Sequence, residues 1–320
     1  MAFGEDIEIS TSHTNIAMNH LICTFLLYLL FCFFVTETTA QKLPQKRKIF
    51  KKTANLDQAL NETSGLIYVD GYIWTHNDGG DEPALYKIDT KSGKVTQKLL
   101  ISNAKNVDWE DITQDEKYIY IGDFGNNYGM RTNLTIYKIK RSALSGKNSA
   151  TEAEIITFVY PEQTDFKRSN THNFDCEGFF ALNGELHLFT KNRGDGMTQH
   201  YTLPTSAGNH KAQLQMTFNT KGQITAADIS PDGKTVILTG YTPRKLFMWI
   251  YNDYIGTQFF SGKYRRICMG RFVFRGQMEG VCFSGNDKGY ISAEQVRKNN
   301  FIIKRQHLRY FSIDKFLQNN

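Results

Sequence analysis

The stretch "NFDCEGFFALNGELHLFTKN" (Asn173–Asn192) holds the pattern that decides the fold of this 320-residue chain. An acid, Glu177, stands just before the apolar run "FFAL", the turn sequence "LNG" follows, and "ELHLFT" then alternates polar and apolar residues. Asn and Gly readily adopt the backbone angles that a tight hairpin turn needs. The stretch therefore predicts two antiparallel strands, with a carboxylate at the start of the first.

The same pattern occurs five times along the chain. Each copy has an acid, one or two small or acidic residues, an apolar position and a turn rich in Gly, Asp or Asn. The copies begin with "NETSGLIYVDG" at Asn61, "DWEDITQDE" at Asp108, "DCEGFFALNG" at Asp175, "AADISPDG" at Ala226 and "MEGVCFSGND" at Met278. A repeat of about 50 residues built from short strands is typical of a β-propeller.

Further strand-like runs fill each repeat. Second strands are predicted at "YIWTHND", "KYIYIGDFGNN", "ELHLFTKN", "TVILTGYT" and "GYISAEQ". Third strands are predicted at "ALYKID", "LTIYKIK", "QHYTLP", "KLFMWIY" and "NFIIKRQHL", with "RYFSID" extending the last or starting a short fourth. Fourth strands are predicted at "KVTQKLLI", "EIITFVYP", "LQMTFN" and "RFVFR". We therefore predict an all-β fold of four-stranded blades.

The last repeat lacks a fourth strand, while the segment "KRKIFKKT" near the N-terminus has no blade of its own. We predict that this segment completes the last blade, because closing the ring removes open sheet edges. The prediction is one domain, residues 41–320, with five blades. Six blades are the alternative, because the long second repeat has room for extra strands. A β-sandwich or two small barrels is the alternative fold.

The repeated acids form a predicted metal site. The first strand of a propeller blade lines the central channel, so five acids at blade starts would converge on one axis. Like charges brought together repel, and a bound cation relieves the repulsion. Carboxylate oxygens without His or Cys suit Ca²⁺. The predicted ligands are Glu62, Glu110, Glu177, Asp228 and Glu279, with Asp108, Asp111 and Asp175 beside them. Alternatively, these acids accept hydrogen bonds from backbone N–H groups where the blades begin.

A polar crown is predicted on the same face as the acids. The second strand of each blade runs back toward the start of the first, and its end carries polar residues. The predicted ligand-binding residues are His76, Asn77, Asp78, Asp123, Asn126, Asn127, Lys191 and Arg193. The loop "GDFGNN" (Gly122–Asn127) is the most distinctive segment of this crown, although Gly and Asn also form turns with no chemical role.

Composition limits the compartment and the partners. The apolar run "LICTFLLYLLFCFFV" (Leu21–Val35) is shorter than the about 20 residues that span a bilayer and resembles the core of a signal peptide that ends at Ala40. Met18 is a plausible true start, and an uncleaved anchor is the alternative. Residues 1–40 are the predicted signal peptide, and no other span is expected. The product would be periplasmic, at the cell surface or secreted, and monomeric.

The remaining composition excludes several classes. The net charge is +6, but the bases are scattered and no nucleic-acid-binding motif accompanies them, so nucleic acid is not an expected partner. Three cysteines would remain after cleavage, Cys176, Cys268 and Cys282, and their spacing suits buried apolar positions rather than disulfides or zinc.

These motifs resemble a known family. The segments "ETSGL", "DWEDI", "DCEG" and "MEG", together with "SGLIYVDGYIWTHND" and "GDFGNN", are similar to the SdiA-regulated and phytase-like β-propellers, exported proteins of Bacteroidetes-type bacteria. The resemblance spans about Glu62 to Ile313. It implies an exported propeller of a family in which some members hold calcium on the axis, and by motif match the calcium ligands carry over to Glu62, Glu110, Glu177 and Glu279. "AADIS" departs from the Glu-Gly form, and phytase activity does not carry over.

Three functions follow from these observations. The first is an exported binding protein that uses the crown, organised by Ca²⁺, to hold a small molecule or an envelope partner. It rests on the acid ring and on the lack of a nucleophile–base motif. The second is a metal-dependent hydrolase of a phosphoester, ester or lactone, with His76 as the base. The third is an adhesive or structural envelope protein.

Overall fold

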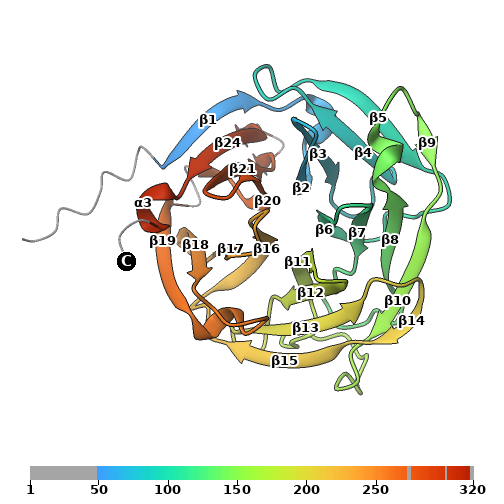
Figure 1. Ribbon diagram of the computed structural model, residues 1–320, viewed down its shortest axis with the longest axis vertical. Coiled ribbons are helices and arrows are strands. Elements are labelled where there is room, and N and C mark those ends of the chain that lie inside the picture. Colours follow the sequence, from blue (N-terminus) through green and yellow to red (C-terminus); the bar gives the residue numbers. More distant parts are fainter. Residues whose placement is uncertain (1–48, 272–274, 300, 318–320) are drawn as a thin grey trace, which may run out of the picture. The chain divides into compact units, whose positions relative to one another are not determined.

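Short strands rich in β-branched and aromatic residues, joined by tight turns, form five sheets around one axis (Figure 1). The computed structural model describes residues 49–271, 275–299 and 301–317. In each sheet the first strand named below lies nearest the axis, and the following strands lie progressively farther out. Blade 1 consists of β2 (Thr63–Val69), β3 (Tyr72–Asn77), β4 (Ala84–Ile88) and β5 (Val95–Ile101), and blade 2 of β6 (Trp109–Gln114), β7 (Tyr118–Asp123), β8 (Leu134–Lys140) and β10 (Glu154–Val159). Blade 3 consists of β11 (Cys176–Leu182), β12 (Glu185–Thr190), β13 (Thr198–Pro204) and β15 (Gln213–Phe218), and blade 4 of β16 (Gln223–Ile229), β17 (Thr235–Tyr241), β18 (Lys245–Asn252) and β19 (Lys263–Arg271). Blade 5 consists of β20 (Met278–Gly285), β21 (Lys288–Ala293), β24 (His307–Ser312) and β1 (Phe50–Asn55).

The N-terminal strand closes the ring, as predicted. β1 lies antiparallel to β24, with Phe50 opposite Phe311 and Asn55 opposite His307. Blade 5 therefore contains strands from both ends of the chain, and the side-by-side placement of β1 and β24 is visible in Figure 1. Such a closure ties the first and last blades together without leaving an open edge between them.

The second and third repeats each add one edge strand, and neither forms a sixth blade. β9 (Ala150–Thr151) lies parallel to β5 on the outer edge of blade 1. β14 (Gly208–Lys211), from the third repeat, lies parallel to β10 on the outer edge of blade 2. Each extra strand therefore extends a neighbouring blade, and the fold is a five-bladed propeller.

Two strand predictions were wrong. Of "NFIIKRQHL", only His307 and Leu308 belong to the third strand of blade 5, which is β24 and continues into the predicted extension "RYFSID"; β23 (Phe301–Lys304) instead pairs with β22 (Val296–Lys298) in a separate hairpin. In blade 4 the fourth strand is β19, upstream of the predicted "RFVFR", of which residues 272–274 lie outside the described residues. In both cases two neighbouring runs of apolar and basic residues could fill the same strand position in the blade. The sequence does not distinguish them, and the hydrogen-bond pairing in the structure does.

The core lies between neighbouring blades. Between blades 1 and 2, for example, Trp74, Leu85 and Ile121 are fully buried and pack in one cluster. Burying each large apolar side chain stabilises the fold by about 1.5–3 kcal/mol. The described cysteines are free thiols, and Cys176 and Cys282 are buried as predicted, whereas Cys268 is only half-buried.

Helices are short wherever the structure describes them. They are η1 (Gln58–Leu60), η2 (Arg141–Leu144), η3 (Phe259–Ser261) and α3 (Asp314–Leu317). No helix among the described residues has the length and apolar character to cross a bilayer. The predicted signal peptide, residues 1–40, lies outside the described residues.

Candidate metal-binding site

A β-bulge at the start of the inner strands positions three glutamates. The pairing of β6 with β7 skips Glu110, that of β11 with β12 skips Glu177, and that of β20 with β21 skips Glu279. A bulge turns the extra residue out of the alternating pattern. The bulges of β2 and β16 hold Ser64 and Thr225 instead, so three of the five blades supply an acid at this position.

Glu62 and Asp228 are not equivalent to these three glutamates, contrary to the alignment of the repeats. Glu62 precedes β2, and its backbone oxygen accepts the Asp78 N–H at 2.9 Å. Asp228 lies three residues beyond the bulge, and its Oδ2 accepts the Phe283 N–H at 2.6 Å, which joins blade 4 to blade 5. Asp111 joins blade 2 to blade 3 in the same way, by accepting the Phe179 N–H at 3.1 Å. For Asp228 and Asp111, the backbone-acceptor interpretation therefore describes the observed contacts.

The glutamates gather with aspartates from the loops into one acidic face. Carboxylate oxygens of Asp78, Asp108 and Glu110 lie within 4.8 Å of one another, and so do those of Glu110, Asp175 and Glu177. Glu110 belongs to both groups and lies between them. We call Asp78, Asp108 and Glu110 the blade 1–2 half, and Asp175, Glu177 and Glu279 the blade 3–5 half.

The blade 3–5 half contains its own cations. Lys191, at the end of β12, is buried, and its Nζ donates to Glu177 Oε1 at 2.7 Å. Arg193 Nε donates to Asp175 Oδ2 at 2.8 Å. Burial opposes the charged form of Lys191, but Glu177 and then Glu279 outweigh it and raise its pKa. Lys191 therefore stays protonated beside these acids, while burial raises the Glu177 pKa well above its usual range against the opposing effect of Lys191.

No basic side chain forms an ion pair with the blade 1–2 half among the described residues. Glu110 is only 7% exposed, and no hydrogen-bond donor of the described residues reaches its carboxylate. Burial, and then the nearby Glu177 and Asp78, raise the Glu110 pKa well above its usual range. Burial and Asp78 also raise the pKa of Asp108 to about 6. Among the described residues, this half therefore brings together three acids that must either bind protons or be balanced by a cation from outside.

A second carboxylate, that of Glu279, also has an oxygen without a hydrogen-bond partner. Glu279 is 6% exposed, and its Oε1 is buried without a hydrogen-bond partner. Burial raises the Glu279 pKa to about 7 even though Lys191 lowers it. Glu294, just after β21, has its pKa raised to about 9 by burial and by Glu279. Such buried carboxylates are costly unless they are protonated or bind a cation.

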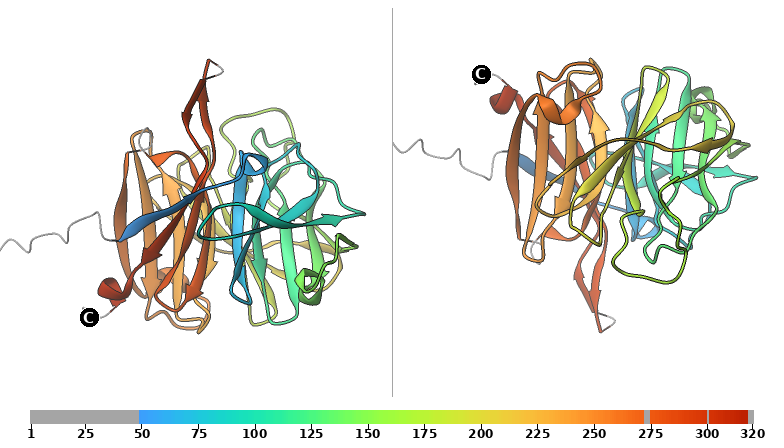
Figure 2. Two further views of the ribbon diagram at one scale, coloured as in Figure 1. Left: turned by 90° about the horizontal axis from the view of Figure 1, so that it is seen from above. Right: turned by 90° about the horizontal axis from the view of Figure 1, so that it is seen from below.

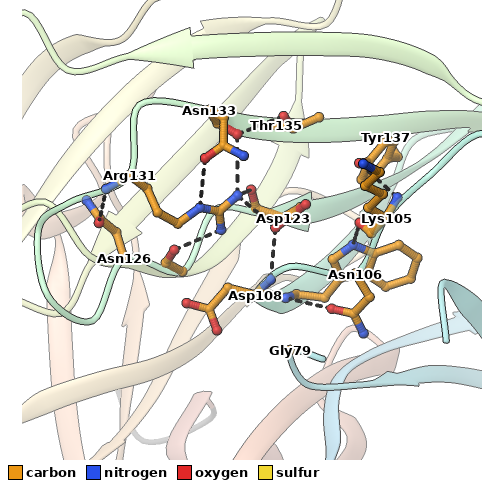
Figure 3. A network of polar contacts seen from close by, with 12 residues as sticks. Gly79, Lys105, Asn106, Asp108, Asp123, Asn126, Arg131, Asn133, Thr135 and Tyr137 are labelled. Atoms are coloured by element: carbon orange, nitrogen blue, oxygen red, sulfur yellow. Dashed lines mark hydrogen bonds and ion pairs between the residues drawn. The ribbon is translucent and has the colours of Figure 1, made fainter. Parts of the chain in front are cut away.

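The loop after β7 holds the blade 1–2 half in place (Figure 3). The Asp108 N–H donates to Asp123 Oδ1 at 3.0 Å, and Arg131 pairs with the same carboxylate at 2.9 Å. The Asp108 carboxylate points away from this pair, as Figure 3 shows. A side chain at Gly125 would overlap the carboxylates of Glu110 and Asp108, so this loop approaches them closely only because it has glycine there.

The predicted crown residues divide into two sets. Some are buried scaffold: Asp123 pairs with Arg131, Asn126 Nδ2 donates to the Phe174 oxygen at 3.0 Å, and Asn77 Nδ2 donates to the Ala59 oxygen at 2.7 Å. The others border the acids: Asp78, Asn127, Lys191 and Arg193. Asn127 is exposed and bonds to both Asp108 and Arg193.

His76 belongs to the scaffold rather than to the open face. Its ring is fully buried and meets Trp109 edge-on at 5.5 Å between ring centres. Burial lowers the His76 pKa to about 4. Sequence reasoning missed the roles of Arg131 and Gly125, although both lie in or next to the distinctive loop "GDFGNN".

Comparisons with known proteins bear on the fold only. No protein-family description matches this sequence, and no curated protein matches it. Among solved structures, the PQQ-bound aldose sugar dehydrogenase of Streptomyces coelicolor is similar with 12% identity, a TM-score of 0.46, and coverage of 82% of this chain and 97% of that chain. The Dos1 propeller shares 13% identity with a TM-score of 0.37, over 72% of this chain and 53% of that chain, so the match spans about half of Dos1. The Cps50 (Swd1) propeller domain of Myceliophteria thermophila shares 8% identity with a TM-score of 0.39, over 82% and 99%. At such scores the likeness says nothing about what this chain binds.

Proposed function

We propose that this protein is an exported β-propeller binding protein whose acidic face holds a Ca²⁺ ion through Asp78, Asp108 and Glu110. One observation carries the proposal. The Glu110 carboxylate is buried without a donor or a basic partner among the described residues, and two further carboxylates lie within 4.8 Å of it. Leaving such a group charged and unpaired is costly, and a divalent cation would offset that cost.

The donor set suits calcium. All three groups offer hard oxygen atoms, and neither His nor Cys accompanies them, which favours Ca²⁺ over zinc or copper. Ca²⁺ takes 6–8 oxygen ligands in flexible geometry. Three carboxylates supply three to six of them, and water or a bound ligand would supply the rest. Asp78 and Asp108 are only half-buried, so the open positions would face solvent.

The surroundings favour a ligand with anionic oxygen atoms. Arg193 borders the site with a side chain that is 20% exposed, and Asn127 lies between it and Asp108. A bound cation together with a guanidinium can hold a carboxylate or phosphate group. The resemblance to SdiA-regulated and phytase-like propellers supports a calcium site, and the apolar run at 21–35 supports export. Binding is favoured over hydrolysis because the candidate base, His76, is buried against Trp109.

Titration calorimetry with Ca²⁺ tests the proposal. We expect one ion to bind the wild-type protein, and Glu110→Gln and Asp108→Asn to weaken binding at least tenfold. Glu116→Gln is the matched control, because Glu116 is an exposed acid at the far end of the same β6–β7 hairpin. Absence of Ca²⁺ binding, or equal loss in the Glu116→Gln variant, would overturn the proposal. Turnover of a phosphoester that Glu110→Gln abolishes would replace it with the hydrolase.

A further inference from the structure

The hairpin of β22 and β23 projects from the propeller. It leaves blade 5 between β21 and β24, and its strands pair only with each other among the described residues (Figure 2). β21 ends where β20 begins, with Ala293 opposite Met278. The hairpin therefore rises from the face that carries Glu279 and Glu294.

The base of the hairpin is anchored on both sides. The Gln295 N–H donates to the Asn61 oxygen at 2.7 Å, and the Leu56 N–H donates to the Gln306 oxygen at 3.0 Å. The two glutamine side chains also bond to each other at 3.1 Å, and Gln306 reaches the Asp57 oxygen at 2.8 Å. The fold thus holds the hairpin in a set direction.

The outer part of the hairpin exposes consecutive apolar side chains. Phe301 is 76% exposed, Ile302 42% and Ile303 53%. No other three consecutive large apolar residues are exposed in the part of the chain that the structure describes. A two-stranded hairpin covers neither of its faces and is marginally stable alone in water. This apolar surface therefore indicates a docking surface.

The charge of the hairpin selects its partner. From Gln295 to Gln306 the sequence has no acid and four bases: Arg297, Lys298, Lys304 and Arg305. The pairing interleaves the two kinds of residue, since Lys298 lies opposite Phe301 and Arg297 opposite Ile302. Apolar side chains flanked by bases suit the interface of an anionic bilayer, where the apolar side chains enter the acyl boundary and the bases meet the headgroups.

We propose that the β22–β23 hairpin docks the protein onto an anionic lipid membrane. An acidic protein partner would be recognised through ion pairs and needs no run of Phe and Ile exposed on both faces of the hairpin. A second copy of this chain would bring two sets of bases together, and like charges oppose such a pairing. The inference is independent of Ca²⁺ binding and is tested in the presence of a chelator.

Vesicle sedimentation tests the inference. The full chain is mixed with vesicles of phosphatidylcholine, with or without phosphatidylglycerol. We expect about tenfold stronger binding to the anionic vesicles, weakening as salt is added. Phe301→Ser with Ile302→Ser should lose about tenfold, because the apolar area that enters the bilayer is removed. Lys298→Glu with Arg305→Glu should lose a similar factor.

Matched controls come from the opposite end of the blades. Ile255, 82% exposed, follows the end of β18, and Lys91 and Lys94 lie in the turn after β4. Ile255→Ser, and Lys91→Glu with Lys94→Glu, should bind anionic vesicles like the wild type. Every variant carries the same residues 1–48, so any contribution of that segment cancels. Circular dichroism checks that each variant is folded.

Three results would overturn the inference. The first is equal vesicle binding by the hairpin variants and the wild type. The second is equal binding to neutral and anionic vesicles. The third is no vesicle binding, together with dimers in analytical ultracentrifugation that Phe301→Ser abolishes, because the hairpin would then dock a second copy of the chain.

Discussion

Two halves of one acidic face carry the same residue at the same bulge and differ in what balances it. Glu177 receives the buried Lys191 ammonium at 2.7 Å, whereas Glu110 has no such partner among the described residues. The contrast shows that a repeated motif does not fix a repeated role. One half is an internal ion pair, and the other is suited to a cation from solution.

The largest expected effect comes from removing the internal cation. Lys191→Met would leave Glu177 with only Arg193, whose Nη2 lies 3.8 Å from its Oε1, and breaking a buried pair costs about 3–5 kcal/mol. We expect the free energy of unfolding in urea to fall by this amount. Lys98→Met, at the exposed pair with Glu82, should cost less than about 1 kcal/mol. Similar losses in both variants would mean that Lys191 does not stabilise the blade 3–5 half.

The second prediction concerns the pH dependence of stability, to which a buried histidine pair contributes in addition to the acids. His187 Nδ1 lies 2.9 Å from His200 Nε2, beside Phe259. Burial lowers the pKa of His187 to about 4 and that of His200 to about 3. The unfolded chain binds protons at these groups below about pH 6.5 while the folded chain does not, so stability falls as the pH drops from about 6.5 toward 4.

With the pKa of His200 lowered from about 6.5 to about 3, the expected loss from this residue between pH 7 and pH 4.5 is about 2.5 kcal/mol. Urea unfolding at the two pH values, compared between the wild type and His200→Gln, isolates this effect, because the carboxylates contribute equally to both proteins. The variant should show a smaller difference between the two pH values. An unchanged difference would contradict the buried neutral pair.

The third prediction is that matched substitutions in the two halves change the free energy of unfolding in opposite directions. In a chelator, Glu110→Gln should raise the free energy of unfolding by about 1–2 kcal/mol, because the fold must otherwise bury this carboxylate charged or bind a proton to it, and the amide needs neither. Glu177→Gln should lower it by a similar amount, because Lys191 loses its nearest partner. Urea unfolding of both variants measures the difference. Changes of the same sign would show that the two halves are electrostatically alike.

The smallest expected effect concerns the loop that approaches the acids. Gly125→Ala would place a methyl group against the Glu110 and Asp108 carboxylates. We expect Ca²⁺ affinity to fall about threefold to tenfold in titration calorimetry, since the oxygens must move apart. Unfolding in a chelator should change by less than about 1 kcal/mol. A loss of stability without loss of affinity would place Gly125 in the scaffold alone.

Much of the fold follows from the sequence because its signals are local. The turns "LNG" and "PDG" and the strands around them repeat, and the unpaired "KRKIFKKT" matches the strand missing from the last blade. The hairpin at Phe301 could not be separated from a blade strand, because a run of β-branched residues has the same pattern in either pairing.

The site was predictable by residue type but not by position. The β-bulge at the start of each inner strand sets which residue of the blade joins the acidic face. A bulge shifts the alternation of side chains along the strand by one residue without changing the composition. Asp228 was therefore aligned with Glu177, although Thr225 occupies the equivalent bulge. Likewise, Lys191 and Glu177 lie on different strands, so only the folded structure reveals that one half is already neutralised.

A crystal structure of the protein grown with Ca²⁺, with anomalous diffraction to locate the ion, tests the account most directly. The account predicts one ion with oxygens of Asp78, Asp108 and Glu110 about 2.3–2.6 Å away, and no ion between Glu177 and Lys191. Anomalous density beside Glu177, or a blade 1–2 half without an ion at saturating Ca²⁺, would contradict it.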